Sequence, residues 1–198
     1  IPAFTQNFVD LDIELAQDKI DPNFSYDTAI IASADWQGLI KASLRRDFPE
    51  VNARADKREL YDLVSSGAGD WVRDFVLDNP QSIGGVVRIA VPTSDDIDLL
   101  IKGLIDRTLP ESDRLVSNKE LVWLDHYTAQ GRVHTQFAWM LFTSGDSREP
   151  EMAGLSGAFF GSLLTILVTL AVSFPIGVMA AIYLEELAPK NRITSIIE

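Results

Sequence analysis

Few side chains in this sequence have the type and spacing that catalysis or metal binding requires. The two histidines, His126 and His134, fall in separate predicted elements, and neither has a nucleophile motif or a metal-ligand spacing around it. Isolated histidines of this kind are usually packing or surface residues. We therefore predict no catalytic residue, no metal site and no cofactor, and we expect that the chain is not an enzyme.

A stretch with two glycines, Ser-Ser-Gly-Ala-Gly-Asp at residues 65–70, superficially resembles a phosphate-binding loop. Such loops also need a Lys followed by Ser or Thr, so that the side chains reach the phosphates and their metal ion. Here Gly69 is followed by Asp70 and Trp71. We interpret Gly67 and Gly69 as parts of a turn between helices.

Three carboxylates, Asp95, Asp96 and Asp98, are close enough in sequence to suggest a cation site. They lack the ligand spacing of a calcium loop. Ser94, Asp95 and Asp96 also stand where the N-cap and the first-turn acids of a helix belong. The helix-start interpretation is favoured, and the cation site remains the alternative.

The charge of the chain limits its partners. Only two of the 17 basic and four of the 29 acidic residues follow Pro150, so the first 150 residues carry most of the net charge of −12. Such a surface repels phosphate groups, which excludes nucleic acid as a partner and argues against phosphate collecting on the domain. The absence of cysteine excludes disulfides and thiolate metal sites.

The elements that must carry these residues alternate between strands and helices. Residues 4–15 alternate apolar Val9, Leu11, Ile13 and Leu15 with acidic positions, which predicts a half-buried strand. Further strands are predicted at 86–91 and 132–142. Helices are predicted at 27–48, 55–64, 70–77, from 95 through the apolar positions up to Ile105, and from the capping box of Ser117 and Glu120 to Ala129.

These elements predict an α+β domain over residues 1–143, followed by a polar linker at 144–152. Its first and last strands should pair as antiparallel neighbours, with the strand at 86–91 in the same sheet. All four tryptophans are predicted to lie in the core: Trp36, Trp71, Trp123 and Trp139.

A stretch without charged side chains, residues 152–184, predicts a membrane span. A bilayer core needs about 20 apolar residues of helix, and this stretch is longer. We place the transmembrane helix at 153–184. Pro175 lies inside it and cannot donate a backbone hydrogen bond, so we expect a kink or loosened turn at Pro175 and Gly177.

Small residues recur at every fourth position of this span. Close approach of helices in lipid depends on such residues, because the apolar solvent gives little drive for association. The pattern therefore indicates one helix of a polytopic bundle. The alternative explanation is that small residues are common in membrane spans and that their spacing here is accidental. We call these residues the small-residue ridge: Ala153, Gly157, Gly161, Thr165, Thr169, Ser173, Gly177 and Ala181.

The residues that flank the span indicate its orientation. Lys190 and Arg192 follow it closely, whereas Arg148 is the one basic residue near its start. Basic residues beside a span favour the cytoplasm. We therefore expect residues 185–198 to begin a cytoplasmic loop and residues 1–152 to be extracytoplasmic, in the periplasm of a bacterium.

The end of the span and the residues after it resemble a family of bacterial transport proteins. The residues that carry the resemblance are Pro175, Ile176, Gly177, Ala180, Ala181, Ile182, Tyr183, Leu184, Glu185, Glu186, Ala188, Pro189, Lys190, Asn191 and Arg192. This run is similar to the first core helix and first cytoplasmic loop of the PstA-type permease subunit of phosphate ABC transporters, in the variant with an enlarged extracytoplasmic N-terminal domain. The likeness covers about a quarter of the chain.

The resemblance implies a subunit of an importer for inorganic phosphate in the bacterial inner membrane. Its partners would be a second permease subunit, two ATP-hydrolysing subunits, a periplasmic phosphate-binding protein and the lipid bilayer. The chain would then be a piece of a longer permease. The alternative is a single-pass membrane-anchored sensor or adaptor with an extracytoplasmic binding domain, and a membrane-anchored hydrolase ranks third because no nucleophile and base are paired.

Overall fold

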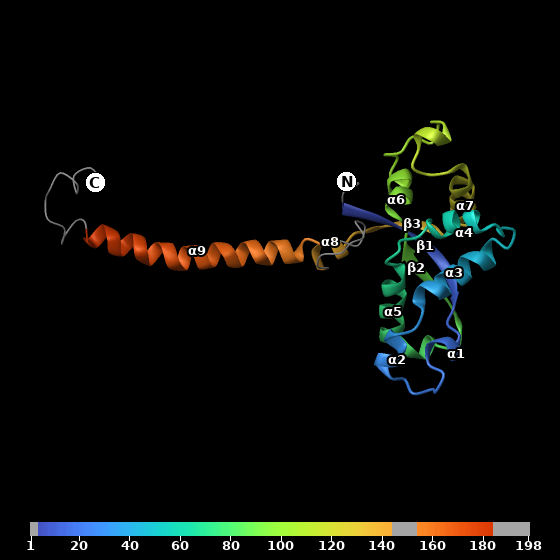
Figure 1. Ribbon diagram of the computed structural model, residues 1–198, viewed down its shortest axis with the longest axis horizontal. Coiled ribbons are helices and arrows are strands. Elements are labelled where there is room, and N and C mark those ends of the chain that lie inside the picture. The colour runs from blue at the N-terminus through green and yellow to red at the C-terminus, as the bar shows by residue number, and fades with distance from the viewer. Residues whose placement is uncertain (1–3, 144–153, 184–198) are drawn as a thin grey trace.

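A three-stranded antiparallel sheet, in the order β2-β1-β3, is the framework of residues 4–143 (Figure 1). The computed structural model describes residues 4–143 and 154–183. The strands are β1 (Thr5–Glu14), β2 (Val86–Pro92) and β3 (Val133–Phe137). The helices are α1 (Gln17–Ile20), α2 (Thr28–Ala32), α3 (Trp36–Asp47), α4 (Arg54–Tyr61), α5 (Ala68–Asp78), η2 (Pro80–Ser82), α6 (Asp95–Ile101), η3 (Glu111–Asp113), α7 (Asn118–Ala129), α8 (Met140–Thr143) and α9 (Ser156–Ile182).

The central strand β1 has the predicted alternation. Val9, Leu11 and Ile13 are at most 2% exposed, whereas Asp10 and Asp12 point to the partly solvated face. On that face, Asp12 lies opposite Arg88 of β2 and accepts two hydrogen bonds from it, at 2.9 and 3.1 Å. The strand is therefore held by apolar burial on one side and by an ion pair on the other.

The predicted pairing of the strands is confirmed. Leu11 pairs with Ile89 of β2, and Thr5 pairs with Phe137 of β3, both in antiparallel register. The beginning of β1 and the end of β3 therefore lie together at one end of the sheet, the end from which α8 and α9 continue (Figure 1).

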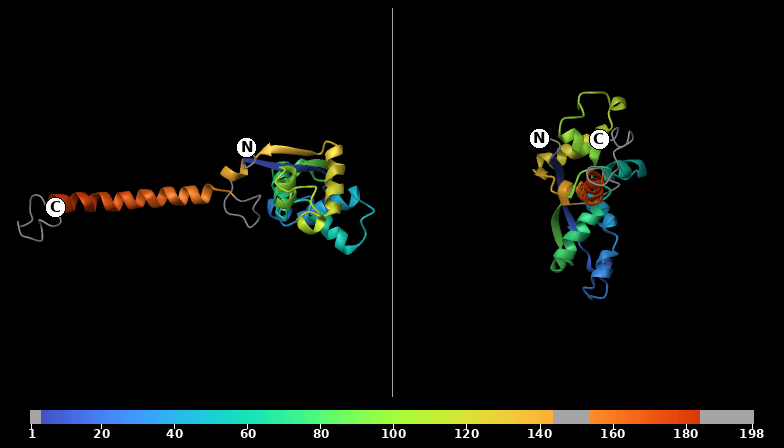
Figure 2. Two further views of the ribbon diagram at one scale, coloured as in Figure 1. Left: turned by 90° about the horizontal axis from the view of Figure 1, so that it is seen from above. Right: turned by 90° about the vertical axis from the view of Figure 1, so that its left-hand side faces the viewer.

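Helices gather largely on one side of the strands and complete the core (Figure 2). Ile40 and Leu44 of α3 and Val72 of α5 are fully buried in the same cluster as Leu11. Phe48, just after α3, contacts the ring of Tyr127 of α7 edge-on at 5.3 Å. The capping box predicted for Ser117 and Glu120 opens α7 as expected.

Two helices replace the single one predicted at 27–48. The break lies between α2 and α3, where the Asp35 side chain accepts a hydrogen bond from the Gly38 N–H at 2.8 Å. This is an N-cap, and it starts a new helix in place of extending the old one. A similar local cause shortens α6, since Gly103 adopts a φ of +73° after Ile101 and leaves Leu104 exposed.

The last predicted strand, 132–142, is too long. β3 ends at Phe137 because its partner β1 begins at Thr5, and the chain then turns into α8. Trp139 falls in this turn and is 68% exposed, so its predicted place in the core is wrong. Trp36 and Trp123 are buried as predicted, and Trp71 is partly buried.

The long helix α9 occupies most of the span predicted at 153–184. It contains 27 residues and continues past Pro175, and its length and composition suit a membrane crossing. In Figures 1 and 2 it extends away from the α+β domain. Outside the described residues lie Ala153, Leu184, the loop residues 185–198 and the whole linker at 144–152.

Leu11→Ala should lower the free energy of unfolding of the α+β domain by about 2 to 5 kcal/mol, because Leu11 is fully buried at the centre of the sheet. Urea unfolding of the full chain in detergent, followed by tryptophan fluorescence, measures this change. Val122→Ala is the control, because Val122 is 66% exposed and should cost less than about 0.5 kcal/mol. Equal unfolding midpoints for the two variants would contradict the assignment of the core.

Candidate functional site

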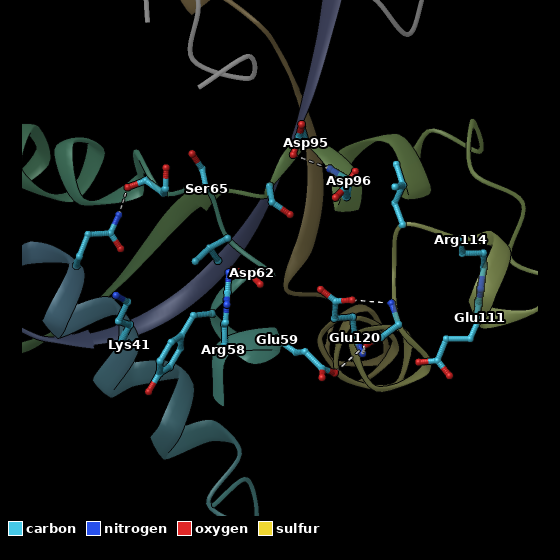
Figure 3. Close-up of a pocket in the computed structure, with 17 residues that line it drawn as sticks. Lys41, Arg58, Glu59, Asp62, Ser65, Asp95, Asp96, Glu111, Arg114 and Glu120 are labelled. Carbon is cyan, nitrogen blue, oxygen red and sulfur yellow. Dashed lines mark hydrogen bonds between the residues drawn. The ribbon is translucent and has the colours of Figure 1, made fainter. Parts of the chain in front are cut away.

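An open cleft of about 740 Å³ lies where α3, α4, the start of α5, the start of α6 and the η3–α7 connection meet (Figure 3). Three cationic side chains line it: Lys41, Arg58 and Arg114. Six carboxylates line it: Glu59, Asp62, Asp95, Asp96, Glu111 and Glu120. Carboxylates therefore outnumber cations two to one.

Helix ends place the acidic side chains around this cleft. Glu59 lies in the last turn of α4, and Asp62 is the C-cap residue of that helix. Glu120 is held from the opposite wall, where its carboxylate accepts a hydrogen bond from the Ser117 N–H at 2.6 Å. The Ser117 hydroxyl donates in turn to Glu59 across the cleft at 3.2 Å. The capping box of α7 thus also helps to join α7 to α4, together with the ion pair of Lys119 with Asp56 at 2.7 Å.

The environment of the cleft disfavours its own negative charge. Burial raises the pKa of Glu120, which is 9% exposed. Burial and the neighbouring Asp95 raise the pKa of Asp96, and partial burial raises that of Asp62 although much of its side chain remains exposed. An excess of poorly compensated carboxylates attracts cationic groups and repels phosphate. The cleft is therefore suited to a cation and is unsuited to the anion that the resemblance implies.

The three aspartates predicted as a helix start or a cation site do not converge. Asp95 accepts a hydrogen bond from the Asp96 N–H at the start of α6, whereas Asp98 turns into the domain. There Asp98 accepts hydrogen bonds from the backbone N–H and the side-chain amide of Asn7, at 3.0 and 2.9 Å, and pairs with Lys102. No group of metal-binding side chains is found among residues 4–143 and 154–183. The helix-start interpretation is confirmed, although Ser94 does not cap through its side chain.

The glycines of residues 65–70 form a packing junction. Gly67 is the N-cap residue of α5, and its N–H donates a hydrogen bond to the Ser65 hydroxyl oxygen at 3.0 Å. A Cβ at Gly69 would lie 3.0 Å from the Gln37 side chain, so this glycine permits α3 and α5 to approach closely. The turn interpretation is confirmed for Gly67 and is wrong for Gly69, because α5 begins at Ala68 and Gly69 lies in its first turn.

Both histidines are packing or surface residues, as expected. His126 contacts the ring of Phe48 at 5.3 Å and shares a hydrogen bond with Gln130. His134 stacks on Phe8 at 6.1 Å and lies 3.6 Å from the Asp10 carboxylate. Neither lines the cleft.

Sequence analysis missed a largely buried ion pair between Arg132, just before β3, and Asp47, the last residue of α3. The Arg132 guanidinium bonds Asp47 at 3.1 Å and lies over the ring of Tyr127 at 4.9 Å, and its Nε–H donates to the Asp10 carbonyl at 2.8 Å. Burial and Asp47 together raise the pKa of Tyr127 strongly. The only sequence signal was an arginine directly after the turn glycine Gly131. Asp98 and Lys102 had a stronger signal, because oppositely charged residues four apart share a helix face.

The small-residue ridge is open along the described part of α9. A Cβ at Gly157, Gly161 or Gly177 would meet no atom within 4 Å. The hydroxyls of Thr165 and Thr169 donate to carbonyls one turn earlier, at Gly161 and Thr165, each at 2.8 Å. The ridge therefore presents small side chains, and its threonine hydroxyls already have hydrogen-bond partners within α9. The kink at Pro175 and Gly177 stays a prediction, and the loop residues Glu185, Glu186, Pro189, Lys190 and Arg192 lie outside the described residues.

Glu120→Gln should stabilise the domain at pH 7 and have less effect near pH 4. Because burial raises the folded-state pKa of Glu120, its contribution to stability is complete below its ordinary value of 4.5 and is lost as the pH rises through the folded-state pKa. Glutamine keeps an acceptor for the Ser117 N–H and never ionises. Unfolding free energies of both chains at the two pH values measure the difference. Ser117→Ala, which removes the cap, should cost about 1 kcal/mol at both; a loss of stability for Glu120→Gln at pH 7 would contradict the electrostatic explanation.

Comparison with known proteins connects the domain to a family. The family described as "Domain of unknown function (DUF3333)" matches residues 1–111, which include β1, β2 and α1 to α6. No curated protein and no solved structure matches the chain. The structure extends the folded unit past the matched residues, because α7 forms one wall of the cleft and β3 completes the sheet. Since the match covers more than half of the 198 residues, the chain belongs to the DUF3333 family.

Proposed function

We propose that the chain is part of an integral membrane permease subunit of an ABC importer for inorganic phosphate. In this proposal α9 is the first core helix of the permease, residues 1–152 face the periplasm, and residues 185–198 begin a cytoplasmic loop. The ATP is hydrolysed by partner subunits, and a second permease subunit completes the translocation path. The observation that carries the proposal is α9 itself, a long apolar helix whose most apolar segment is not buried by any other described part of the chain.

The exposure of α9 supports a lipid environment. Its most apolar segment of 18 residues has a mean hydropathy of 2.3, and none of that segment is buried. Large side chains such as Phe159, Leu167 and Phe174 are more than half exposed. Water does not tolerate a continuous apolar surface of this size, so lipid or other helices must cover it.

The small-residue ridge supports a bundle over a simple tether. Open glycines at Gly157 and Gly161 allow a second helix to approach the backbone, and lipid has no need of such positions. The hydroxyls of Thr165 and Thr169, further along the ridge, are already bonded within α9, so a neighbour need not satisfy them. Packing of small surfaces is then the main interaction that the ridge offers.

The phosphate assignment is supported by the resemblance of residues 175–192 to PstA-type permeases. The α+β domain contributes no phosphate site to the argument, because its cleft is acidic. The domain therefore serves the importer in another way, and the periplasmic binding protein and the other subunits are the partners expected around it.

Single cysteines test the orientation without interference, because the chain contains none of its own. Ser147→Cys should react with a membrane-impermeant maleimide in intact cells, and Asn191→Cys should react only after the cells are permeabilised. The expectation follows from the two basic residues that flank Asn191. Labelling of Asn191→Cys alone in intact cells would reverse the proposed topology.

Gly161→Leu should reduce phosphate uptake and co-purification of the second permease subunit in the full-length protein. Among residues 4–143 and 154–183, no atom beyond the helix's own backbone lies within 4 Å of a Cβ built at Gly161, so a loss would come from a neighbouring helix at the ridge. Overpacking of a close contact costs about 1 to 3 kcal/mol. Uptake of labelled phosphate by cells and pull-down of the partner measure the two effects.

Leu163→Phe is the matched control, because two residues at about 100° each place Leu163 nearly opposite Gly161 on the helix. It adds bulk on the opposite face and should leave assembly nearly intact. If Gly161→Leu and Leu163→Phe behaved alike, with assembly and uptake unchanged, α9 would be a tether and the single-pass sensor or adaptor would become the better explanation.

A further inference from the structure

Four aromatic side chains gather at the end of the domain that leads to α9. We call Phe4, Phe137, Trp139 and Phe142 the aromatic cluster; their exposed fractions are 39%, 47%, 68% and 49%. Phe142 stacks on Phe4 at 6.3 Å and on Phe137 at 6.1 Å, and Phe137 meets Trp139 edge-on at 4.8 Å. The rings therefore form one continuous surface that is about half open.

Backbone contacts fix this cluster to the start of the long helix. The Ala138 N–H donates to the Phe4 carbonyl at 2.9 Å, which extends the β1–β3 pairing as far as the cluster. The Leu155 N–H donates to the Leu141 carbonyl at 2.7 Å, which ties α8 to the residue before α9. The cluster thus lies at the base of α9 and not at a distant point of the domain (Figure 1).

For a membrane-crossing α9, as proposed above, the length of the helix puts this base near the membrane surface. A helix of 27 residues is about 40 Å long at 1.5 Å per residue, whereas the hydrocarbon core is about 30 Å thick. The helix therefore reaches into the headgroup region, and Leu155 with its partner Leu141 falls near the boundary between headgroups and acyl chains.

The chemistry of the segment matches that boundary. Residues 133–143 include no Asp, Glu, Lys or Arg, in a domain that is otherwise rich in acidic residues. Aromatic side chains prefer the membrane interface, where a ring meets the acyl chains and polar groups remain hydrated. The acidic remainder of the domain cannot be drawn to anionic headgroups, so ring insertion is the attraction that remains.

We propose that the aromatic cluster inserts into the headgroup–acyl boundary of the leaflet at the N-terminal end of α9, so that the domain rests on lipid. The inference depends on the proposed membrane crossing of α9. It adds a second point of attachment, which restricts rotation of the domain about the helix. Lipid is the occupant, and neutral lipid suffices.

Depth-dependent fluorescence quenching tests the insertion. In this experiment the full chain carries Phe142→Cys labelled with the fluorophore NBD, at one copy per nanodisc of phosphatidylcholine. The NBD emission should lie at a shorter wavelength than that of an NBD probe exposed to water. Lipids with a nitroxide near the headgroup should quench it more than lipids with a deep nitroxide. Trp139→Asp in the same background should reduce the quenching, because a charged residue replaces the most exposed ring.

Two further labelling positions separate the inference from the proposed function. Leu115→Cys, at a position 73% exposed on the η3–α7 connection, is the control and should show no quenching. Leu167→Cys, near the middle of α9, should be quenched by deep nitroxides. If deep nitroxides quench the Leu167 probe but shallow nitroxides do not quench the Phe142 probe, the inference fails and the membrane crossing of α9 stands. This holds whether the Phe142 probe then reports water or a protein contact. Loss of deep quenching at Leu167 overturns the membrane crossing and the inference with it.

Discussion

The position of β1 between two antiparallel partners is the constraint on which the domain depends. One face of the strand supplies Leu11 and Ile13 to the core, and the helices cover that face. Its other face and its ends are fixed by polar contacts that come from distant parts of the chain. Arg132 bonds the Asp10 carbonyl, and Asp98 bonds Asn7. A change in the register of β1 by one residue would exchange the buried and solvated sides and break both contacts together.

Sequence reasoning succeeded where the signal is local. The alternation of residues 4–15 identified the central strand, the box of Ser117 and Glu120 identified the start of α7, and the uncharged run identified α9. Each of these patterns depends on neighbours within one or two turns or one strand. The order of the strands was also predictable, because a first and a last strand that run antiparallel can pair as neighbours in one sheet.

The failures have a common physical cause, which is that the deciding contact comes from elsewhere in the chain. β3 stops at Phe137 because β1 starts at Thr5, and nothing within residues 132–142 marks that point. The cleft joins Asp62 to Asp96 and Glu120, which no spacing rule would group. Trp139 was assigned to the core on composition, but the pairing of two distant strand ends places it on the surface.

The pairing of Thr5 with Phe137 brings the two ends of the domain together. The chain enters and leaves the folded unit at adjacent positions, and opposed residues in an antiparallel pair are only about 5 Å apart. A tight turn could span the same gap. The two ends of the folded unit are therefore close enough for protein engineering to graft it into a loop of another protein without changing the spacing of that loop's ends.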